Sequence, residues 1–339
     1  MATPYVALDT NIWRSNFLLR TPLGAALLFM LRQSSGKLVL PEVVEVEVNK
    51  LIPKFGLEEA KKVSDSFHSI EMLTGSRPKF NLPSELTLQD AVAKRFAELE
   101  HFLLRVPTTP NHLQAAFQRV MSDEAPNAPG REQFKDSLIW VGLLEVGSKA
   151  RDDVYLHFVS SDNAFFESRK TANGLAARLK HEAGNNFRMH SDLKSCLKSM
   201  RENITPLDKN EIADDIVEAV RQKASDYALD FEMELGELMS CEVEGFLTEK
   251  VDNIAIAFTV NLALIRNNQP GAPDDSISVT GEAIYDQQHG QVSRIEIHSA
   301  HLKWWTVDAG LNQRRIISSV GMTGERRMVD YRFREKLDW

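Results

Sequence analysis

Two short apolar runs in this chain end in an aspartate, and this arrangement strongly constrains the fold. Tyr5–Leu8 precedes Asp9, and Val154–Ser161 precedes Asp162. Short apolar runs bounded by polar turns are typical of buried strands in a parallel sheet. In open α/β sheets, ligands bind beyond the carboxyl ends of the strands. The pattern therefore predicts a parallel α/β domain that presents Asp9 and Asp162 to a ligand.

Two further acids lie between these strands, in segments expected to be helical. Glu47 belongs to Pro41–Val48, and Asp136 belongs to Phe134–Trp140. Carboxylates that share one site repel one another unless a cation compensates their charge. Mg²⁺ and Mn²⁺ prefer oxygen ligands, and they can activate water for attack on a phosphodiester. The residues predicted to bind Mg²⁺ or Mn²⁺ and to act in catalysis are Asp9, Glu47, Asp136 and Asp162.

Polar side chains beside these acids are candidates for a supporting role. Thr10, Asn11 and Ser160 stand where a hydroxyl or amide would fix a carboxylate rotamer. Arg131 and Lys135 precede Asp136 closely and are expected to meet substrate phosphates. The residues predicted to bind substrate are Asn11, Arg131, Lys135 and Ser160.

Other catalytic motifs are missing from the sequence. It contains no Gly-rich phosphate loop, no H-E-x-x-H and no G-x-S-x-G. A phosphatase with Asp9 as nucleophile would need a second Asp two residues later, where Asn11 stands. These observations leave the carboxylate site as the leading hypothesis.

Each acid taken alone also has an ordinary structural explanation. Asp9 and Asp136 precede or begin helical patterns, where an acid caps free N–H groups or complements the helix dipole. Glu47 would then be a solvated residue on an exposed helix face, and Asp162 would begin a turn. Only their joint occurrence favours a metal site.

The spacing of apolar residues predicts the remaining elements of residues 1–204. Lys37–Leu40 is a second short strand, and a helix should begin at Pro41, because Pro is favoured at the first helical position. Thr87–Leu104 is expected to be an amphipathic helix, and another should begin at about Ala164. Ser122–Arg131, rich in Pro and polar residues, is predicted to be a mobile loop that borders the site.

Residues 205–339 have a different pattern and predict a smaller α+β domain. The change falls near Asn203–Leu207 and is followed by a long acidic helix, Asp208–Met239. Strict apolar alternation then marks strands of an antiparallel meander. Residues 1–204 carry 26 Lys and Arg against 24 Asp and Glu, whereas residues 205–339 carry 14 against 24. The N-terminal part is therefore better suited than the acidic C-terminal part to meet nucleic acid.

Cysteine and histidine spacing indicates no further metal site. Cys196 and Cys241 lie far apart and match no ligand spacing, so both are expected to be structural. His190 and His298 also lack partners at a suitable spacing. No stretch approaches the roughly 18 apolar residues of a membrane span. We therefore expect a cytoplasmic protein that does not enter the membrane.

The four acidic segments together resemble a PIN domain. The matching stretches are Leu8–Ile12, Pro41–Val48, Phe134–Trp140 and Phe158–Asp162, over about residues 4–190. The F-K-D-x-hydrophobic-I-W segment is most similar to a larger bacterial branch of that family. The resemblance implies a parallel sheet between helices and Mg²⁺- or Mn²⁺-dependent endonucleolytic cleavage, usually of RNA.

Carried over by position, the resemblance makes Asp9, Asp136 and Asp162 direct metal ligands. Glu47 completes the set, through a water molecule or directly, with Glu45 as the alternative. The family often has a second Asp shortly after the last ligand, where this chain has Ala164. That departure leaves the number and affinity of the bound ions open.

The resulting hypothesis is a metal-dependent endoribonuclease, by family analogy a toxin-like or phage-defence effector. The alternatives are a structure-specific DNA nuclease and a catalytically silent scaffold that binds RNA or protein. The C-terminal domain, residues 205–339, is expected to select substrate, bind a protein partner or form a homo-oligomer.

Overall fold

The computed structural model describes residues 3–76, 81–167, 174–200, 209–229, 232–266, 269–270, 275–307, 313–321 and 331–333. The chain divides into two compact units. Residues 1–20 and 27–201 form the N-terminal unit, and residues 21–26 and 202–339 form the C-terminal unit. The predicted boundary at Asn203–Leu207 lies outside the described residues.

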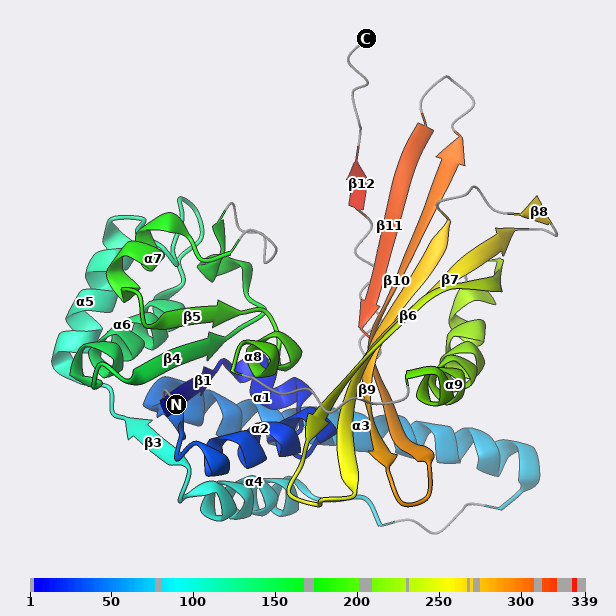
Figure 1. Cartoon of the computed structure of the whole chain (residues 1–339), viewed down its shortest axis with the longest axis horizontal. Helices are drawn as coiled ribbons and strands as arrows, with labels where there is room; N and C mark the ends of the chain where they lie inside the picture. The colour runs from blue at the N-terminus through cyan, green and yellow to red at the C-terminus, as the bar shows by residue number, and fades with distance from the viewer. Residues whose placement is uncertain are drawn as a thin grey trace. The chain divides into compact units, whose positions relative to one another are not determined.

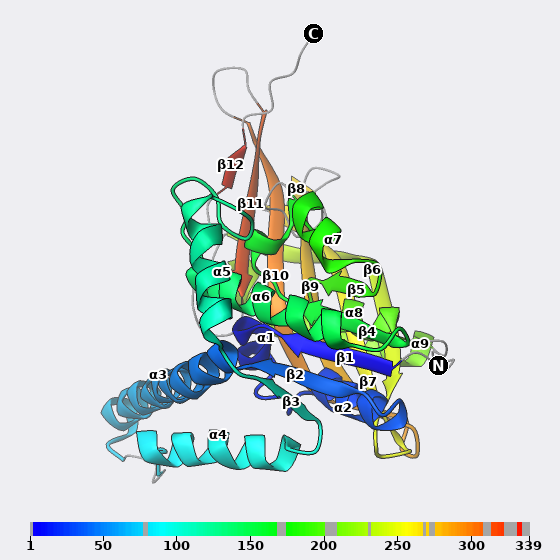
Figure 2. The same cartoon turned by 90° about the vertical axis from the view of Figure 1, so that its left-hand side faces the viewer.

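The N-terminal unit is built on a parallel sheet, as the sequence predicts. Within the described residues the strand order is β3-β2-β1-β4-β5, and every pairing is parallel. Figures 1 and 2 show these strands between helices, with α2 on one side and α6 on the other. The strands are β1 (Thr3–Leu8), β2 (Lys37–Pro41), β3 (Leu103–Val106), β4 (Val154–Val159) and β5 (Phe187–His190).

Helices supply the crossovers that parallel strands require. Because each crossover returns the chain to the same end of the sheet, the carboxyl ends of the strands meet at one edge. The helical elements of this unit are α1 (Thr10–Ser15), α2 (Pro22–Gln33), α3 (Glu42–Thr74), α4 (Glu85–Leu99), α5 (Pro110–Met121), α6 (Phe134–Lys149), η1 (Asn163–Phe165), α7 (Ala177–Ala183) and α8 (Leu193–Ser199).

The core of this unit covers both faces of its central strands. Val6, Ala7 and Leu8 of β1 are at most 1% exposed, although they point to alternate faces. Trp13 of α1 and Trp140 of α6 are completely buried. Full burial of one large apolar side chain contributes about 1.5–3 kcal/mol. The strand that leads into Asp9 is therefore held firmly in place.

The predicted helix Thr87–Leu104 is wrong at its C-terminal end. α4 ends at Leu99, and Leu103–Val106 forms the edge strand β3 beside β2. A short apolar run fits a buried helix or a strand equally well. Here its pairing with β2 decides between them.

Two other expectations also need correction. The helix expected from about Ala164 is only the short 3₁₀ turn η1, and the next helix, α7, begins at Ala177. Pro41 is the last residue of β2 and precedes α3 rather than beginning it. The stretch Ser122–Arg131 is a loop, as predicted, and it contains hydrogen-bonded turns.

The C-terminal unit is α+β, again as predicted. Figure 1 shows a twisted antiparallel sheet with α9 lying against it. Among the described residues the main strand order is β12-β11-β10-β9-β7-β6. Its elements are α9 (Lys209–Leu229), β6 (Met233–Leu247), β7 (Asn253–Arg266), β8 (Gln269–Pro270), β9 (Ser276–Asp286), β10 (Gln291–Val307), β11 (Gln313–Gly321) and β12 (Tyr331–Phe333).

Apolar residues at strand and helix spacing form the core of this unit. Alternate residues of β7, from Ile254 to Leu264, are at most 1% exposed. Ile212, Ile216 and Val220 lie one helical turn apart on α9 and are buried in the same core. The predicted acidic helix is too long, because Met233–Leu247 pairs with β7 as a strand.

No helix in the described part of the chain combines the length and apolar character needed to cross a membrane.

Candidate active site

The parallel pairing of β1 and β4 places Asp9 and Asp162 at one edge of the sheet. Leu8 is opposite Val159 in the register, and the Asp9 N–H donates to the Val159 carbonyl at 2.9 Å. Each aspartate follows its strand and caps the next element. Asp9 Oδ1 accepts from the Thr10 N–H at 2.7 Å, and Asp162 Oδ1 accepts from the Ala164 N–H at 2.8 Å. The capping role considered for Asp9 and the turn considered for Asp162 are therefore both real, and each aspartate has a second carboxylate oxygen for other partners.

Ser160 joins these two residues. Its fully buried hydroxyl donates to Asp9 Oδ2 at 2.6 Å. The Ser160 hydroxyl oxygen also accepts from the Asp162 N–H at 3.0 Å. Ser160 thus fixes the Asp9 carboxylate and the turn that carries Asp162. This is the supporting position that the sequence indicated for it.

Glu47 reaches the same region from α3. Its Oε2 accepts from the Thr10 hydroxyl at 2.7 Å, and its Oε1 accepts from Lys135 Nζ at 2.6 Å. Burial by itself would raise the pKa of Glu47. The bonds from Lys135 and Thr10 outweigh it, so the pKa of Glu47 is lowered and the carboxylate is ionised.

The two other glutamates at the start of α3 have different partners. Glu45 pairs with Arg105 Nε at 3.1 Å, and Glu42 Oε2 accepts from the Thr108 N–H at 2.7 Å. Both therefore bind β3 and the residues just after it. Of the three glutamates, the contacts favour Glu47 as the member of the acidic site.

Asp136 lies in the first turn of α6, and its titration shows how close the acids are. Burial, together with the carboxylates of Asp162, Asp9 and Glu47, raises the pKa of Asp136 to about 7. Burial, with smaller contributions from Asp162 and Glu47, likewise raises the pKa of Asp9 to about 6, although the hydrogen bonds from Ser160 and Thr10 lower it. The four acids thus share one electrostatic site, here called the acidic cluster: Asp9, Glu47, Asp136 and Asp162.

The donor set of the acidic cluster fits a hard divalent cation. Its donors are carboxylate oxygens, and its excess negative charge is partly offset by Lys135. The carboxylate oxygens of the acidic cluster are more widely spaced than the most compact group of potential ligands among the described residues, whose ligand atoms all lie within 4.8 Å of one another. An open set of acids suits Mg²⁺, which binds through a few carboxylates and keeps several waters.

The other predicted substrate-binding residues differ in exposure. Asn11 lies on α1, and its Oδ1 is buried without a hydrogen-bond partner, so it can still accept a donor. Lys135 is 64% exposed but is held by Glu47. Arg131 is exposed at the end of the turn Ala128–Arg131.

Sequence reasoning missed a residue that shapes the approach to Asp136. Asn127 is 4% exposed. Its Oδ1 accepts from the Gln133 N–H at 2.7 Å, and its Nδ2 donates to the Ser137 hydroxyl at 2.8 Å. Asn127 therefore fastens the turn region to the first turn of α6. The only signal for it was an Asn in a Pro-rich turn, because such side chains often bond to nearby backbone.

Sequence comparison supports the resemblance seen in the acidic segments. Residues 6–165 match the family model of the PIN domain, and this stretch contains all four members of the acidic cluster. No curated protein and no solved structure gives a significant match to the chain.

Proposed function

We propose that this chain, whose residues 6–165 form a PIN domain, is a metal-dependent endoribonuclease. PIN domains are generally nucleases and typically use divalent metals. The observation that carries the proposal is the acidic cluster. Two of its members have pKa values raised to about 6 and about 7 by burial and by neighbouring carboxylates. Such a site is best stabilised by a divalent cation.

The residues of the acidic cluster have separate tasks in this proposal. Asp9, Asp136 and Asp162 would hold Mg²⁺ or Mn²⁺, and Glu47 would complete the set. The bound ion would supply an activated water and stabilise the leaving oxygen of the phosphodiester. Ser160 and Thr10 keep the Asp9 and Glu47 carboxylates in fixed orientations, through bonds of 2.6 and 2.7 Å.

Substrate phosphates would meet the cations on the exposed side of the cluster. Arg131 and Lys135 are both exposed and precede Asp136. Lys135 is held by Glu47 in an exposed ion pair, which costs little to exchange for a phosphate contact. Asn11 can donate its amide N–H to a bound strand.

Ala164 supports a second candidate function, a scaffold that binds RNA or protein without cutting it. It is 3% exposed and stands where the family often has a further Asp. Its methyl group supplies no ligand. A site with fewer donors binds metal more weakly, so binding could persist after catalysis is lost.

The C-terminal unit is proposed to select substrate, partner or oligomeric state. Residues 205–339 carry 24 Asp and Glu against 14 Lys and Arg. This negative balance disfavours a long phosphate-binding surface. It supports recognition of a protein, including a second copy of this chain.

Cleavage assays with the full chain test the proposal directly. Single-stranded RNA and DNA are incubated with Mn²⁺, Mg²⁺ or EDTA, and the wild type is compared with Asp9→Asn. A matched control is Asp153→Asn, because Asp153 is exposed and pairs with Arg151 away from the acidic cluster. We expect metal-dependent RNA cleavage that Asp9→Asn abolishes and Asp153→Asn preserves.

The other outcomes separate the alternatives. Cleavage of DNA alone would identify a DNA nuclease. RNA binding without cleavage, unchanged in Asp9→Asn, would identify a scaffold and overturn the proposed chemistry.

A further inference from the structure

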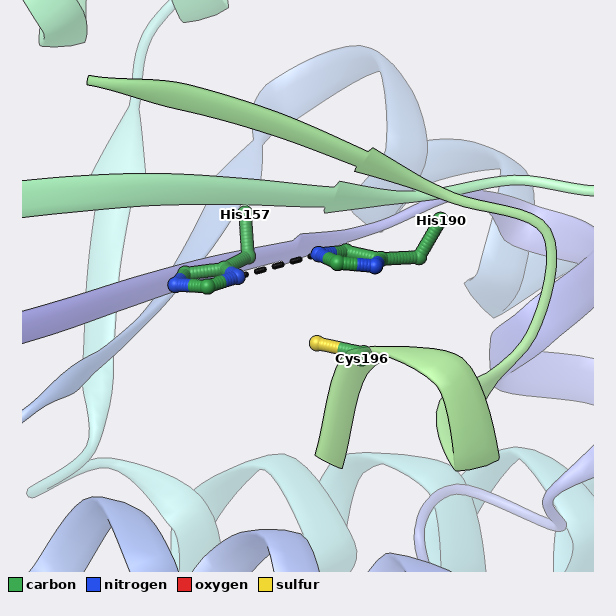
Figure 3. A group of neighbouring side chains, drawn as sticks. All are labelled: His157, His190 and Cys196. Carbon is green, nitrogen blue, oxygen red and sulfur yellow. Dashed lines mark hydrogen bonds between the residues drawn. The ribbon is translucent and has the colours of Figure 1, made fainter. Parts of the chain in front are cut away.

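Three buried side chains of the N-terminal unit gather their ligand atoms at one point, as Figure 3 shows. They are His157, His190 and Cys196, here called the His–Cys cluster, and their ligand atoms all lie within 4.8 Å of one another. His157 Nδ1 is 3.0 Å from His190 Nε2. The two rings are stacked with their planes 14° apart, and the Cys196 sulfur points toward the pair.

The parallel sheet brings the two histidines together. His157 lies on β4 opposite Arg188 of β5, and His190 is two residues farther along β5. Residues two apart on a strand point to the same face, so both imidazoles lie on one face of the sheet. Because β5 is the edge strand, nothing within the described sheet pairs beyond it.

The short helix α8 completes the cluster. Asp192 caps it by accepting from the Ser195 N–H at 2.7 Å, and Cys196 follows in the next turn. Cys196 is fully buried, His157 is 5% exposed and His190 is 8% exposed. Ser199, one turn later, places its hydroxyl 3.4 Å from His157 Nδ1 and 3.3 Å from His190 Nε2.

We propose that the His–Cys cluster is a structural site for Zn²⁺ or a similar borderline-soft divalent metal. One thiolate and two imidazoles are the donors that zinc prefers. A tetrahedral zinc ion places such donor atoms about 3.3–3.6 Å apart. The two ring nitrogens are already close to this spacing, and a small shift of Cys196 on α8 brings its sulfur into range. The Ser199 hydroxyl or one water fills the fourth position.

Metal binding at the His–Cys cluster shifts one ring proton and releases one thiol proton. Without metal, one ring N–H lies between the two imidazoles and donates to the other ring. On metal binding that proton moves to the outer nitrogen of its ring, and the thiol proton is released to solvent. Each imidazole then uses its inner lone pair for the metal, and the thiolate supplies the only negative charge.

The site would fasten the edge of the sheet. The metal would join β4, the edge strand β5 and α8 at one point. The His190 carbonyl accepts from the Ser160 N–H at 3.0 Å, and Ser160 holds Asp9. The ion would therefore steady one support of the acidic cluster without being a part of it. The inference does not depend on nuclease activity.

Cobalt spectroscopy of the full chain tests the proposal, because only a thiolate ligand gives an intense thiolate-to-cobalt charge-transfer band. The protein is stripped with a chelator and titrated with Co²⁺ and then with Zn²⁺. We expect one equivalent of Co²⁺ to give the band and Zn²⁺ to abolish it. Zn²⁺ should also raise the midpoint of thermal unfolding by several degrees.

Three variants assign the band. Cys196→Ser should lose it. Cys241→Ser should keep it, because Cys241 lies in the C-terminal unit, far from this cluster in the sequence. Asp9→Asn should also keep it, which separates this site from the acidic cluster.

X-ray absorption of the zinc-loaded wild type covers the case in which Cys196→Ser fails to fold. It should show one sulfur and two imidazole nitrogens around zinc. A folded wild type that gives no thiolate–cobalt band, or zinc surrounded by oxygen and nitrogen alone, would overturn the proposal. The cluster would then be a hydrogen-bonded histidine pair in the core.

Discussion

The acidic cluster and the His–Cys cluster both adjoin β4, yet their donors and their surroundings differ. The first consists of carboxylates at the carboxyl edge of the sheet, where Glu47 keeps 22% of its side chain exposed. The second consists of nitrogen and sulfur donors that are all at least nine-tenths buried. Hard oxygen donors in an open site suit Mg²⁺, whereas imidazole and thiolate in a closed site suit zinc.

The clusters also differ in how they fare without metal. Burial and mutual repulsion raise the pKa of Asp9 and Asp136, so without a cation the acidic cluster is destabilising at neutral pH. Burial lowers the pKa of His157 to about 3 and that of His190 to about 4, so both rings are neutral. They satisfy each other with one hydrogen bond. The acidic cluster therefore needs a cation to offset its negative charge, whereas the neutral His–Cys cluster can do without one.

The largest effect is expected from removing a charge of the acidic cluster. Asp136→Asn keeps the shape of the side chain but loses one metal ligand. Even residues behind a metal ligand change affinity or activity by about 10–100-fold, so we expect a loss of at least about 100-fold in RNA cleavage. Initial rates at saturating Mn²⁺ measure it. Glu145→Gln is the control on the same helix, because Glu145 pairs with Lys149 and His112 instead. Equal rates for Asp136→Asn and the control would remove Asp136 from the active site.

The next effect tests the residue that lies between the two clusters. Ser160→Ala removes the hydroxyl that donates to Asp9 and accepts from the Asp162 N–H. We expect Mn²⁺ affinity or cleavage to fall by about 10–100-fold. Titration of the rate against Mn²⁺ distinguishes the two. Ser34→Ala is the control, because its hydroxyl bonds to the Met30 carbonyl at the end of α2. A Ser160→Ala enzyme that needs no more Mn²⁺ and cuts as fast as wild type would contradict this role.

Stability against pH should report on the acidic cluster in the metal-free protein. The folded-state pKa values of Asp9 and Asp136 lie near 6 and 7, above the ordinary value of 3.8. The folded state therefore binds protons more tightly than the unfolded state. These two groups contribute stability below about pH 4, and the contribution is lost as the pH rises toward 7.

Thermal unfolding in EDTA measures this effect. We expect the midpoint of wild type relative to that of Asp136→Asn to fall as the pH rises from about 4 to 7, and Mg²⁺ to reduce the fall. A difference that is constant over this range would show that Asp136 is not desolvated as described.

The smallest effect concerns the exposed cation beside the acidic cluster. Lys135→Met removes one ion pair, and such exposed pairs contribute about 0.2–1 kcal/mol. We expect KM for RNA to rise a few-fold, and the salt dependence of binding to weaken by about one phosphate contact. Lys149→Met is the control, because Lys149 is equally exposed on the same helix and pairs with Glu145. Identical salt dependence in both variants would exclude a phosphate contact of Lys135.

Much of the fold followed from local patterns in the sequence. The runs before Asp9 and Asp162 are strands as predicted, and the alternating segments of the C-terminal unit are antiparallel strands. The first residues of the edge strand Leu103–Val106, up to Leu104, and of the strand Met233–Leu247, up to Met239, were assigned to the ends of helices. Both errors have one cause, since pairing with a neighbouring strand of the sheet overrode a local pattern that also suited a helix.

For the candidate sites, the sequence by itself indicated Asp9, Asp136 and Asp162 of the acidic cluster, because strand ends and helix starts are visible locally and parallel strands end at one edge. It left the second acid open, and the partners of Glu45 and Glu47 in the folded chain now favour Glu47. The His–Cys cluster was decided by tertiary structure alone. His190 was expected to have no partner, and Cys196 no metal-ligand spacing. Strand register and the position of α8 bring these side chains together from 33 and 39 residues beyond His157. The spacing of these residues along the sequence does not predict that they lie together, because their proximity depends on which strands pair and how a helix packs beside them.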